Sequence, residues 1–345
     1  MRAVELTGPR RLQLASWPDL SAPPPGHIQV RVTHVGVCGS DMHYFSEGGI
    51  GDVPSEYPMV LGHEPTGRIA AVGAGVTGWA RGDPVIVEPA LYCYHCEFCL
   101  SGRHNVCASL RFLSQPDEPG LLRDFANLPA TNVLPVPEGL SLREATLAEP
   151  LAIILHSMRF AALRPGETAV VFGAGPIGLL TIAVVKIAGA SRIWAVEPVA
   201  HRREMALRLG ADAALDPHAI DAAAAILDET GGRGVDAAID CAARNGSINQ
   251  AIRAVCPGGR VVMTGIPVER EIAIEYHVLR RKEAAFLNVR RSCHETPRAA
   301  QLLAERPERF VPMLTHTRPL ERAQAAFELL EGFHDGVGKL VMEVD

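Results

Sequence analysis

The stretch from residue 168 to residue 178 reads TAVVFGAGPIG, and it sets the architecture of the second half of the chain. Its first five residues have the character of a short buried strand, and a glycine-rich turn follows at once. Residues 179–188 continue as an apolar helix, and residues 193–196 form a second apolar run. This order of strand, turn, helix and strand predicts one parallel βαβ unit.

The glycines of the turn have the spacing G-x-G-x-x-G. Gly173 permits the tight turn, Gly175 lets the backbone approach a pyrophosphate, and Gly178 lets the helix pack closely on the strand. The free N–H groups at the helix N-terminus then face the phosphates. We therefore predict that a dinucleotide binds at Gly173, Gly175, Pro176, Ile177 and Gly178.

An acidic residue at the end of the second strand indicates which dinucleotide binds. Glu197 follows Gly178 by 19 positions. Its carboxylate can accept hydrogen bonds from both ribose hydroxyls and would repel a 2′-phosphate, which favours NAD over NADP. Arg202 is predicted to contact the cofactor. Arg203 fits a cofactor contact or a solvated helix start equally well, and these arginines leave NADP as the alternative.

The alternation of strands and helices continues beyond this unit. Further strands are expected at residues 211–216, 235–240, 259–265 and 284–289, and helices at residues 219–229 and 248–255. The fold class is therefore α/β, with a doubly wound parallel sheet of Rossmann type at residues 154–283.

The rest of the chain has a different character. Residues 1–153 are rich in glycine, proline and short β-like runs, which indicates a separate β-rich domain. Residues 284–345 contain one or two helices and a last strand at residues 339–344. This C-terminal segment is expected to return to the first domain.

Four of the eight cysteines lie close together, at Cys93, Cys96, Cys99 and Cys107. The spacing C-x2-C-x2-C-x7-C lets successive thiolates surround one ion, and it predicts a structural zinc in a lobe at about residues 88–108. An iron–sulfur site is the metal alternative, although the last gap does not match the bacterial ferredoxin run. Buried apolar thiols are the remaining alternative.

A second set of metal-binding side chains is scattered along the first half of the chain. Cys38 lies in a glycine-rich break after a strand-like run, His63 and Glu64 follow an apolar run, and Glu149 precedes an apolar helix start. Together they offer the S, N and O donors of a catalytic zinc. The spacing alone does not show that they converge, and His63 alone would fit an ordinary core histidine. By default, Cys241, Cys256 and Cys293 are expected to be small core residues.

Composition excludes several classes of protein. Of the 345 residues 48% are hydrophobic and 21% are charged, so wholesale disorder is excluded. The formal net charge of −6 argues against a nucleic-acid partner. The longest apolar stretch is broken by glycines and Lys186, so no membrane span is expected. The first residues lack a signal-peptide core because Glu5 interrupts them, and a cytoplasmic location is expected.

Taken together, these motifs resemble a known family, the zinc-containing medium-chain alcohol dehydrogenases, and within it the sorbitol/xylitol (polyol) dehydrogenase branch. The likeness covers nearly the whole chain. Its carriers are residues 36–44 (GVCGSDMHY), 62–64 (GHE), 149–151 (EPL) and 173–178 (GAGPIG), together with the four-cysteine lobe. The resemblance implies a GroES-like catalytic domain, a Rossmann domain, NAD, and two zinc ions per chain, one catalytic and one structural.

The resemblance also implies roles for site residues. Cys38, His63 and Glu64 match the catalytic zinc ligands, and Glu149 matches a carboxylate that binds the metal directly or through its water. Whether Glu64 or Glu149 is the direct ligand stays open.

Further matches concern the pocket and the proton path. Tyr44 and Phe112 match residues lining the polyol pocket, and Arg291 matches an arginine near cofactor and substrate. Ser40 and His43 match one path for the released proton, and Glu149 is the other candidate. One departure is Asp124, which stands where the resemblance implies an arginine.

The expected function is hydride transfer from a secondary hydroxyl of a polyol or related sugar alcohol to NAD, giving a ketose. L-threonine 3-dehydrogenase or another small secondary-alcohol dehydrogenase is the alternative enzyme. A structural or sensor protein that binds NAD and zinc is the non-enzyme alternative. The resemblance implies a homo-oligomer, tetramer or dimer, with the strand at residues 260–265 as a sheet edge that pairs across subunits.

Overall fold

The computed structural model describes residues 1–345 and divides into two compact units. Unit 1 contains residues 1–152 and 293–345, and unit 2 contains residues 153–292. Helix α4 (Ala148–Ala161) contains the first crossing between them. The second crossing follows Ser292 rather than residue 283, because strand β18 (Ala285–Asn288) pairs with the sheet of unit 2.

Unit 2 is built on a six-stranded sheet in which every neighbouring pair is parallel. Its order is β15-β14-β13-β16-β17-β18, which is the doubly wound order 3-2-1-4-5-6. The strands are β13 (Thr168–Phe172), β14 (Arg192–Val196), β15 (Ala213–Leu215), β16 (Val235–Asp240), β17 (Val255–Met263) and β18. The predicted Rossmann fold is confirmed.

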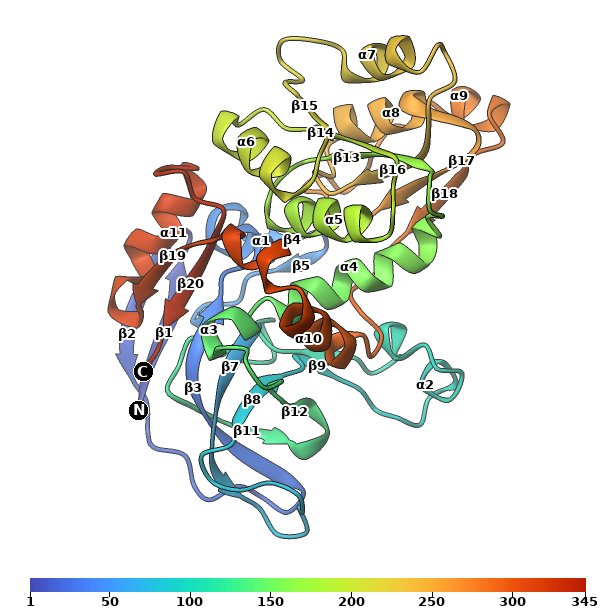
Figure 1. Cartoon of the computed structure of the whole chain (residues 1–345). Helices are drawn as coiled ribbons and strands as arrows, with labels where there is room; N and C mark the ends of the chain where they lie inside the picture. The colour runs from blue at the N-terminus through green and yellow to red at the C-terminus, as the bar shows by residue number, and fades with distance from the viewer. The chain divides into compact units, whose positions relative to one another are not determined.

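The helices of unit 2 lie on both sides of this sheet, with α5 and α6 on one side and α7, α8 and α9 on the other (Figure 1). They are α5 (Pro176–Ile187), α6 (Ala200–Leu209), α7 (Ala222–Glu229), α8 (Asn245–Ala254) and α9 (Tyr276–Arg281). Helix α7 begins three residues later than expected because the Asp221 side chain accepts a hydrogen bond from the Ala224 N–H and caps it.

The expectation that residues 260–265 form a sheet edge is wrong. These residues fall in and just after β17, which lies between β16 and β18. The edge on this side of the sheet is β18, a strand of four residues. The sequence suggested a later, shorter strand because Pro257 and Gly258 interrupt the apolar run.

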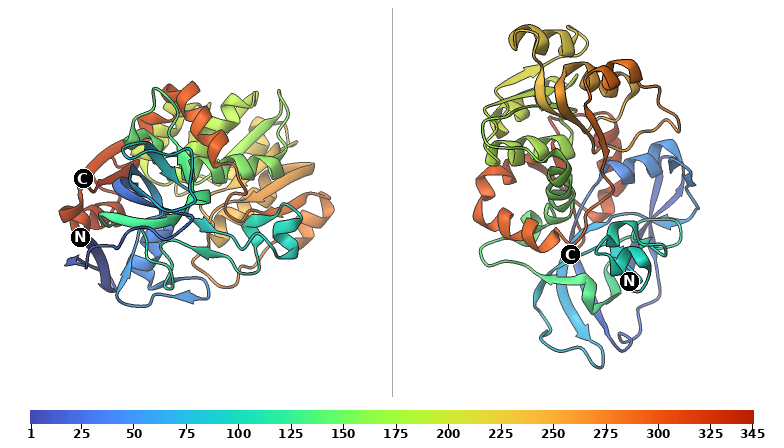
Figure 2. Two further views of the ribbon diagram at one scale, coloured as in Figure 1. Left: turned by 90° about the horizontal axis from the view of Figure 1, so that it is seen from below. Right: turned by 90° about the vertical axis from the view of Figure 1, so that its right-hand side faces the viewer.

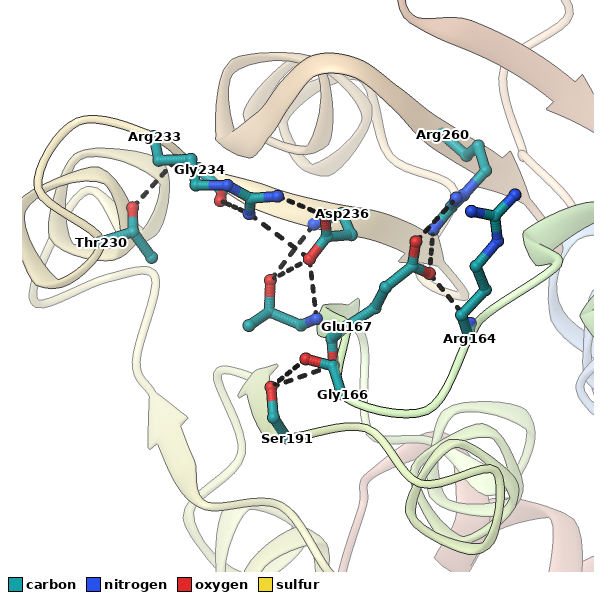
Figure 3. Close-up of polar contacts among 10 residues, drawn as sticks. Arg164, Gly166, Glu167, Ser191, Thr230, Arg233, Gly234, Asp236 and Arg260 are labelled. Carbon is teal, nitrogen blue, oxygen red and sulfur yellow. Dashed lines mark hydrogen bonds and ion pairs between the residues drawn. The ribbon is translucent and has the colours of Figure 1, made fainter.

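A polar cluster links the amino ends of β13 and β16 to Arg260 of β17 (Figure 3). The Glu167 carboxylate accepts a hydrogen bond of 2.6 Å from Arg260, which lies in β17. The Asp236 carboxylate accepts hydrogen bonds of 2.9 Å from the N–H and hydroxyl of Thr168 and pairs with Arg233. These contacts fix the register of β13, β16 and β17.

Unit 1 is mainly antiparallel. Its largest sheet has seven strands in the order β12-β8-β7-β3-β20-β19, with β11 also paired to β3. Three strands form a second sheet, β2-β1-β6, and two antiparallel two-stranded sheets, β9-β10 and β4-β5, complete the unit. The strands are β1 (Arg2–Gly8), β2 (Arg11–Ser16), β3 (His27–Gly36), β4 (Gly49–Ile50), β5 (Val53–Pro54), β6 (Met59–Val60), β7 (Glu64–Val72), β8 (Pro84–Val87), β9 (Ala90–Leu91), β10 (Arg111–Phe112), β11 (Phe125–Pro129), β12 (Val133–Pro135), β19 (Leu314–Pro319) and β20 (Lys339–Glu343).

The C-terminal segment completes the large sheet, because β20 pairs with β3. Strand β19, which the sequence analysis did not foresee, pairs with β20 in parallel. The two chain ends therefore lie side by side in unit 1 (Figures 1 and 2), where Arg2 donates a hydrogen bond to the Val344 carbonyl.

Short helices connect the strands of unit 1. They are α1 (Gly39–Met42), η1 (His43–Glu47), α2 (Glu97–Leu100), η2 (His104–Val106), η3 (Ala130–Asn132), α3 (Leu142–Ala145), α10 (Thr296–Glu305), η4 (Pro307–Arg309), η5 (Val311–Met313), η6 (Leu320–Arg322) and α11 (Ala323–Glu331). The apolar core of the unit packs between the sheets and α11, around Leu6, Phe45 and Phe327.

Candidate metal and cofactor sites

The register of two neighbouring strands brings the scattered metal-binding residues together. Strand β3 pairs antiparallel with β7, and Gly36 at the end of β3 stands opposite Glu64 at the start of β7. Cys38 follows β3 directly and caps helix α1. The ligand atoms of Cys38, His63 and Glu64 consequently all lie within 4.8 Å of one another. A side chain at Gly36 would overlap the Glu64 carboxylate, so only glycine fits there.

His63 is held in place by buried polar neighbours. Its Nδ1 lies 3.3 Å from the Asp41 carboxylate, and its Nε2 lies 3.3 Å from the Ser40 hydroxyl. Asp41 is fixed in turn, because it accepts hydrogen bonds from the Cys38 N–H and the Ser114 hydroxyl. A carboxylate that holds the far nitrogen of an imidazole is the usual outer partner of a metal-binding histidine.

The pKa values of His63 and Asp41 depend on each other and on the groups around them. Burial opposes a charge on His63, but the Asp41 carboxylate and the Cys38 thiol outweigh it and raise the pKa of the imidazole well above its usual value. Burial likewise opposes ionisation of Asp41, yet His63 and the hydrogen bonds lower the pKa of that carboxyl. In the absence of a metal, the site therefore stabilises the protonated, positively charged form of His63.

Glu64 forms an ion pair with a residue from the far end of the chain. The Nζ of Lys339 lies 2.6 Å from Glu64 Oε1, and both side chains are fully buried. Glu64 outweighs the effect of burial on Lys339 and raises the pKa of its amine. Sequence reasoning missed Lys339, although a single lysine at the start of the apolar run Lys339–Glu343 is a signal that could have found it.

Glu149 is a buried carboxyl group in the first turn of α4. Its side chain is 4% exposed, and its Oε2 is buried without a hydrogen-bond partner. Burial raises the pKa of Glu149 to about 8, and the neighbouring Glu64 and Glu88 carboxylates add to this against the effect of His63. Its oxygens are not part of the group within 4.8 Å, but His63, Glu64 and Lys339 are close enough for their charges to act on the pKa of Glu149.

These residues fit a bound divalent cation. Thiolate, imidazole and carboxylate are zinc ligands, and a catalytic zinc uses three of them and leaves one position open. The buried acidic groups of this site, Asp41, Glu64 and Glu149, outnumber its one buried lysine, Lys339. A bound dication would offset this excess and stabilise the Glu149 carboxylate, whose Oε2 has no hydrogen-bond partner, so the donor set and its surroundings favour a metal here.

The four-cysteine lobe fits a second zinc. Its Sγ atoms lie 3.4 Å apart for Cys93 and Cys107, and 3.9 Å apart for both Cys93–Cys99 and Cys96–Cys107. None of the four forms a disulfide. Four sulfurs at about 2.3 Å from one zinc lie about 3.8 Å from each other. Backbone N–H groups of Ala108 and Cys99 lower the pKa of the Cys96 thiol to about 6, whereas burial and the neighbouring thiols raise the pKa of Cys99 to about 12.

The predicted pocket residues lie in the same unit. The Phe112 ring centre is 5.3 Å from that of His63, so this aromatic side chain borders the metal-binding residues. Tyr44 lies in η1 and is buried, while His43, which begins η1, is half-buried. Asp124 does not join them, since its carboxylate accepts hydrogen bonds from the Arg2 guanidinium.

The glycine-rich turn in unit 2 has the geometry that a dinucleotide needs. Gly173 has a φ of +85°, and a Cβ on Gly178 would overlap the Gly173 carbonyl. Helix α5 begins after Gly175 with Pro176 at its first position, a residue preorganised for a helix start. Ile177 follows in the first turn, and Arg202 Nη1 lies 4.0 Å from where a Cβ of Gly175 would stand.

Glu197 holds this turn from the neighbouring strand. Its buried carboxylate accepts hydrogen bonds from the Ala174 N–H at 2.6 Å and the Val199 N–H at 3.0 Å. Arg203, which could have contacted cofactor, instead binds the carbonyls of Glu197 and Pro198 and pairs with Asp216. Arg291 is half-buried near the end of unit 2, with a φ of +54°.

The expectation that Cys293 is a core residue is wrong. Cys293 is half-buried at the start of the return segment of unit 1, and its Sγ lies 3.2 Å from the Gly102 carbonyl. Cys256 is buried. Cys241, also expected in the core, is half-buried beside Thr181, and desolvation by its surroundings raises the pKa of its thiol to about 12.

The fold and the donor sets define a dinucleotide- and metal-dependent dehydrogenase, and comparisons with known proteins agree. Residues 24–138 match the alcohol dehydrogenase GroES-like domain, and residues 176–305 match the zinc-binding dehydrogenase model. Sorbitol dehydrogenase of Bacillus subtilis is 32% identical over 330 residues, which cover 95% of this chain and 93% of that protein. D-xylulose reductase A of Aspergillus niger is 34% identical over 348 residues, covering 99% and 96%.

A zinc-binding dehydrogenase of Sinorhizobium meliloti 1021, solved with NADP bound, has a TM-score of 0.89 at 28% identity, covering 99% of each chain. The chain belongs to the zinc-binding alcohol dehydrogenase family. It is therefore an oxidoreductase with zinc and NAD(P) as its cofactors, and the predicted family and its polyol branch are confirmed. No helix of the structure combines the length and apolarity that crossing a membrane requires.

Proposed function

We propose that this chain oxidises a secondary hydroxyl of a polyol or related sugar alcohol to a ketone, with NAD as the hydride acceptor. The observation that carries the proposal is the convergence of Cys38, His63 and Glu64 beside the buried, unpartnered carboxyl of Glu149. Full-length similarity to a sorbitol dehydrogenase and a D-xylulose reductase supports a polyol substrate. Neither similarity favours the threonine alternative or a non-enzyme.

Three side chains hold the catalytic metal in this proposal. Cys38, His63 and Glu64 supply sulfur, nitrogen and oxygen, and Lys339 compensates one negative charge of the set. When bound, zinc acts as a Lewis acid on the substrate hydroxyl, and NAD takes up the hydride. Asp41 keeps the His63 ring oriented for its role as a ligand.

The chain also has to remove a proton from the hydroxyl. Glu149 is the principal acceptor in this proposal, because its pKa of about 8 without a metal will fall once a cation is close, which leaves a base suited to neutral pH. Ser40 and His43 offer a second route. The hydroxyl of Ser40 lies at hydrogen-bond distance from His63, and His43 is partly accessible at the start of η1.

Substrate and cofactor contacts complete the proposal. Tyr44 and Phe112 line the polyol site, and Arg291 contacts substrate or cofactor. The turn at Gly173, Gly175 and Gly178 binds the pyrophosphate, and Glu197 with Arg202 binds the adenosine ribose. The buried carboxylate of Glu197 at the ribose position supports NAD over NADP. The cysteines of the lobe hold the structural zinc. We further propose a cytoplasmic homo-oligomer.

A substrate panel tests this function. Initial rates of NAD and NADP reduction are measured with sorbitol, xylitol, galactitol, ribitol, L-idonate, L-threonine and simple secondary alcohols. The proposal expects the highest kcat/KM with one of the polyols or sugar acids, and with NAD. A preference for L-threonine or for a simple alcohol would contradict the substrate class, and a preference for NADP would contradict the role given to Glu197.

A further inference from the structure

A second group of nitrogen and sulfur donors lies in unit 1, apart from the two zinc sites discussed above. The ligand atoms of His104, Cys293 and His294 all lie within 4.8 Å of one another. His104 comes from the cysteine lobe, at the start of η2, and the other two begin the return segment of unit 1. None of the three is among the ligands that we assign to either zinc.

The arrangement of the three side chains is close and specific. The rings of His104 and His294 meet edge to face with their centres 4.3 Å apart. The Cys293 Sγ lies 3.2 Å from the carbonyl of Gly102, two residues before His104. The backbone at His294 has a φ of +66°, in the left-handed region that few residues other than glycine adopt.

Ring packing alone explains only part of this cluster. Tyr92 and Tyr94 also contact His104, with ring centres 5.5 and 5.4 Å away, as in an ordinary aromatic cluster. However, the Nδ1 of His104 is buried without a hydrogen-bond partner. An unsatisfied buried nitrogen is costly, and packing against rings does not satisfy it. A metal ion held with the Cys293 thiolate and His294 would.

We propose that His104, Cys293 and His294 form a third metal site that takes a borderline transition-metal dication such as Zn²⁺. Two imidazoles and one thiolate suit zinc and do not suit magnesium or calcium, which prefer oxygen ligands. His294 is exposed, so the fourth position is open to water. Such a site has three protein ligands and exchanges its ion more readily than the closed four-cysteine site.

Occupancy of this site would tie together two segments that are far apart in sequence. His104 lies three residues before the zinc-binding Cys107, and Cys293 is the first residue of unit 1 after the crossing from unit 2. A bound ion would therefore anchor the start of the return segment to the cysteine lobe. The site would respond to free zinc at concentrations that leave the two proposed zinc sites saturated.

Metal counting tests the proposal on the full-length, zinc-loaded protein. Equilibrium dialysis against Zn²⁺ should show one more ion per chain in the wild type than in Cys293→Ser, and His294→Ala should weaken the third binding step at least about tenfold, since even outer-shell changes cost 10–100-fold in metal affinity. Cys256→Ser and His218→Ala are matched controls in unit 2 and should keep the third ion.

Cobalt gives a second readout that does not depend on activity. Co²⁺ is added to protein that holds zinc at the two assigned zinc sites only. It should produce a thiolate-to-cobalt charge-transfer band in the wild type and in His218→Ala, and no such band in Cys293→Ser. Two ions per chain in the wild type at saturating Zn²⁺ would overturn the proposal. So would a third ion, or a cobalt–thiolate band, that survives in Cys293→Ser.

Discussion

Two carboxyl groups at the candidate catalytic site have different environments and so different roles. Glu64 is neutralised by a buried lysine and lies within 4.8 Å of Cys38 and His63, whereas the Glu149 oxygen has no hydrogen-bond partner. When two neighbouring carboxyl groups lie in different environments, one commonly serves as a ligand or structural group and the other as an acid or base.

This difference makes Glu149→Gln a test of the acid–base role. The variant keeps the volume of the side chain but removes its ability to accept a proton. We expect kcat to fall by about 10²-fold or more, with NAD affinity and zinc content unchanged. Stopped-flow turnover, NADH titration and metal analysis measure these three quantities, with the exposed Glu138→Gln as control. Full turnover in Glu149→Gln would show that another group takes the proton.

Lys339 allows a stability prediction at the same scale. Replacing Lys339 with methionine leaves the Glu64 carboxylate buried with no positive side chain against it, which typically costs about 3–5 kcal/mol. The double variant Lys339→Met/Glu64→Gln should regain most of this loss, because no charge is then left unpaired. Urea unfolding of the four members of the cycle, all freed of zinc because Glu64 is also a proposed zinc ligand, measures the coupling. Additive effects of the two changes would mean that the ion pair does not stabilise the fold.

At the scale of elements, the cysteine lobe depends on its metal more than on its packing. Its helices α2 and η2 have four and three residues, which is too short to be stable alone. Without added Zn²⁺, Cys107→Ser should therefore lower the content of tightly bound zinc from two ions per chain to one, and should make residues 93–107 sensitive to protease. Metal analysis and limited proteolysis followed by peptide mapping check both. A lobe that resists protease without its zinc would show that side-chain packing holds it.

The polar cluster at the amino ends of β13 and β16 gives a pH prediction. Burial opposes ionisation of Asp236, but Arg233 and Thr168 prevail and lower its pKa to about 2. Because the pKa of Asp236 is lower in the folded state than in the unfolded state, where it is near 4, the ionised carboxylate stabilises the fold above about pH 4. This stabilisation is lost as the pH falls from about 4 to about 2. Asp236→Asn should cost about 1 kcal/mol at pH 7, after allowance for solvent screening, and nothing below about pH 2.

Trp194 fluorescence measures the unfolding of unit 2. Trp17 and Trp79, which lie in unit 1, are replaced with phenylalanine so that Trp194 is the only tryptophan left. In this background, the urea midpoints of the protein with and without Asp236→Asn are compared across the pH range, with Asp228→Asn as the control in α7. A difference between the two proteins that is constant from pH 7 to pH 2 would contradict the assigned pKa.

At the scale of the whole molecule, the two units differ in how far the sequence predicts them. Unit 2 was predictable because its signals are local: β13 and β16 have the predicted ends, and the glycine spacing identifies the turn. The ends of α7 and β17 were not predictable from such local signals. The cap at Asp221 determines where α7 begins, and the pairing with β18 helps to determine the extent of β17.

The site in unit 1 depends on contacts between distant parts of the chain. His63 and Glu64 could be suspected as metal ligands, but their approach to Cys38 follows from the pairing of β3 with β7. Lys339 reaches Glu64 only because β20 joins the same sheet. Periodicity and spacing carry no information on such pairings, and the resemblance to a family supplied it for Cys38, His63 and Glu64 but not for Lys339.

The metal dependence of polyol oxidation tests the central claim most directly. Initial rates of NAD reduction with the best polyol of the panel are measured on the purified protein, after removal of metal by a chelator, and after Zn²⁺ is restored. We predict turnover that disappears with the metal and returns with zinc in the wild type, and that does not return in His63→Ala. Undiminished polyol oxidation in protein shown to contain no zinc would contradict the account.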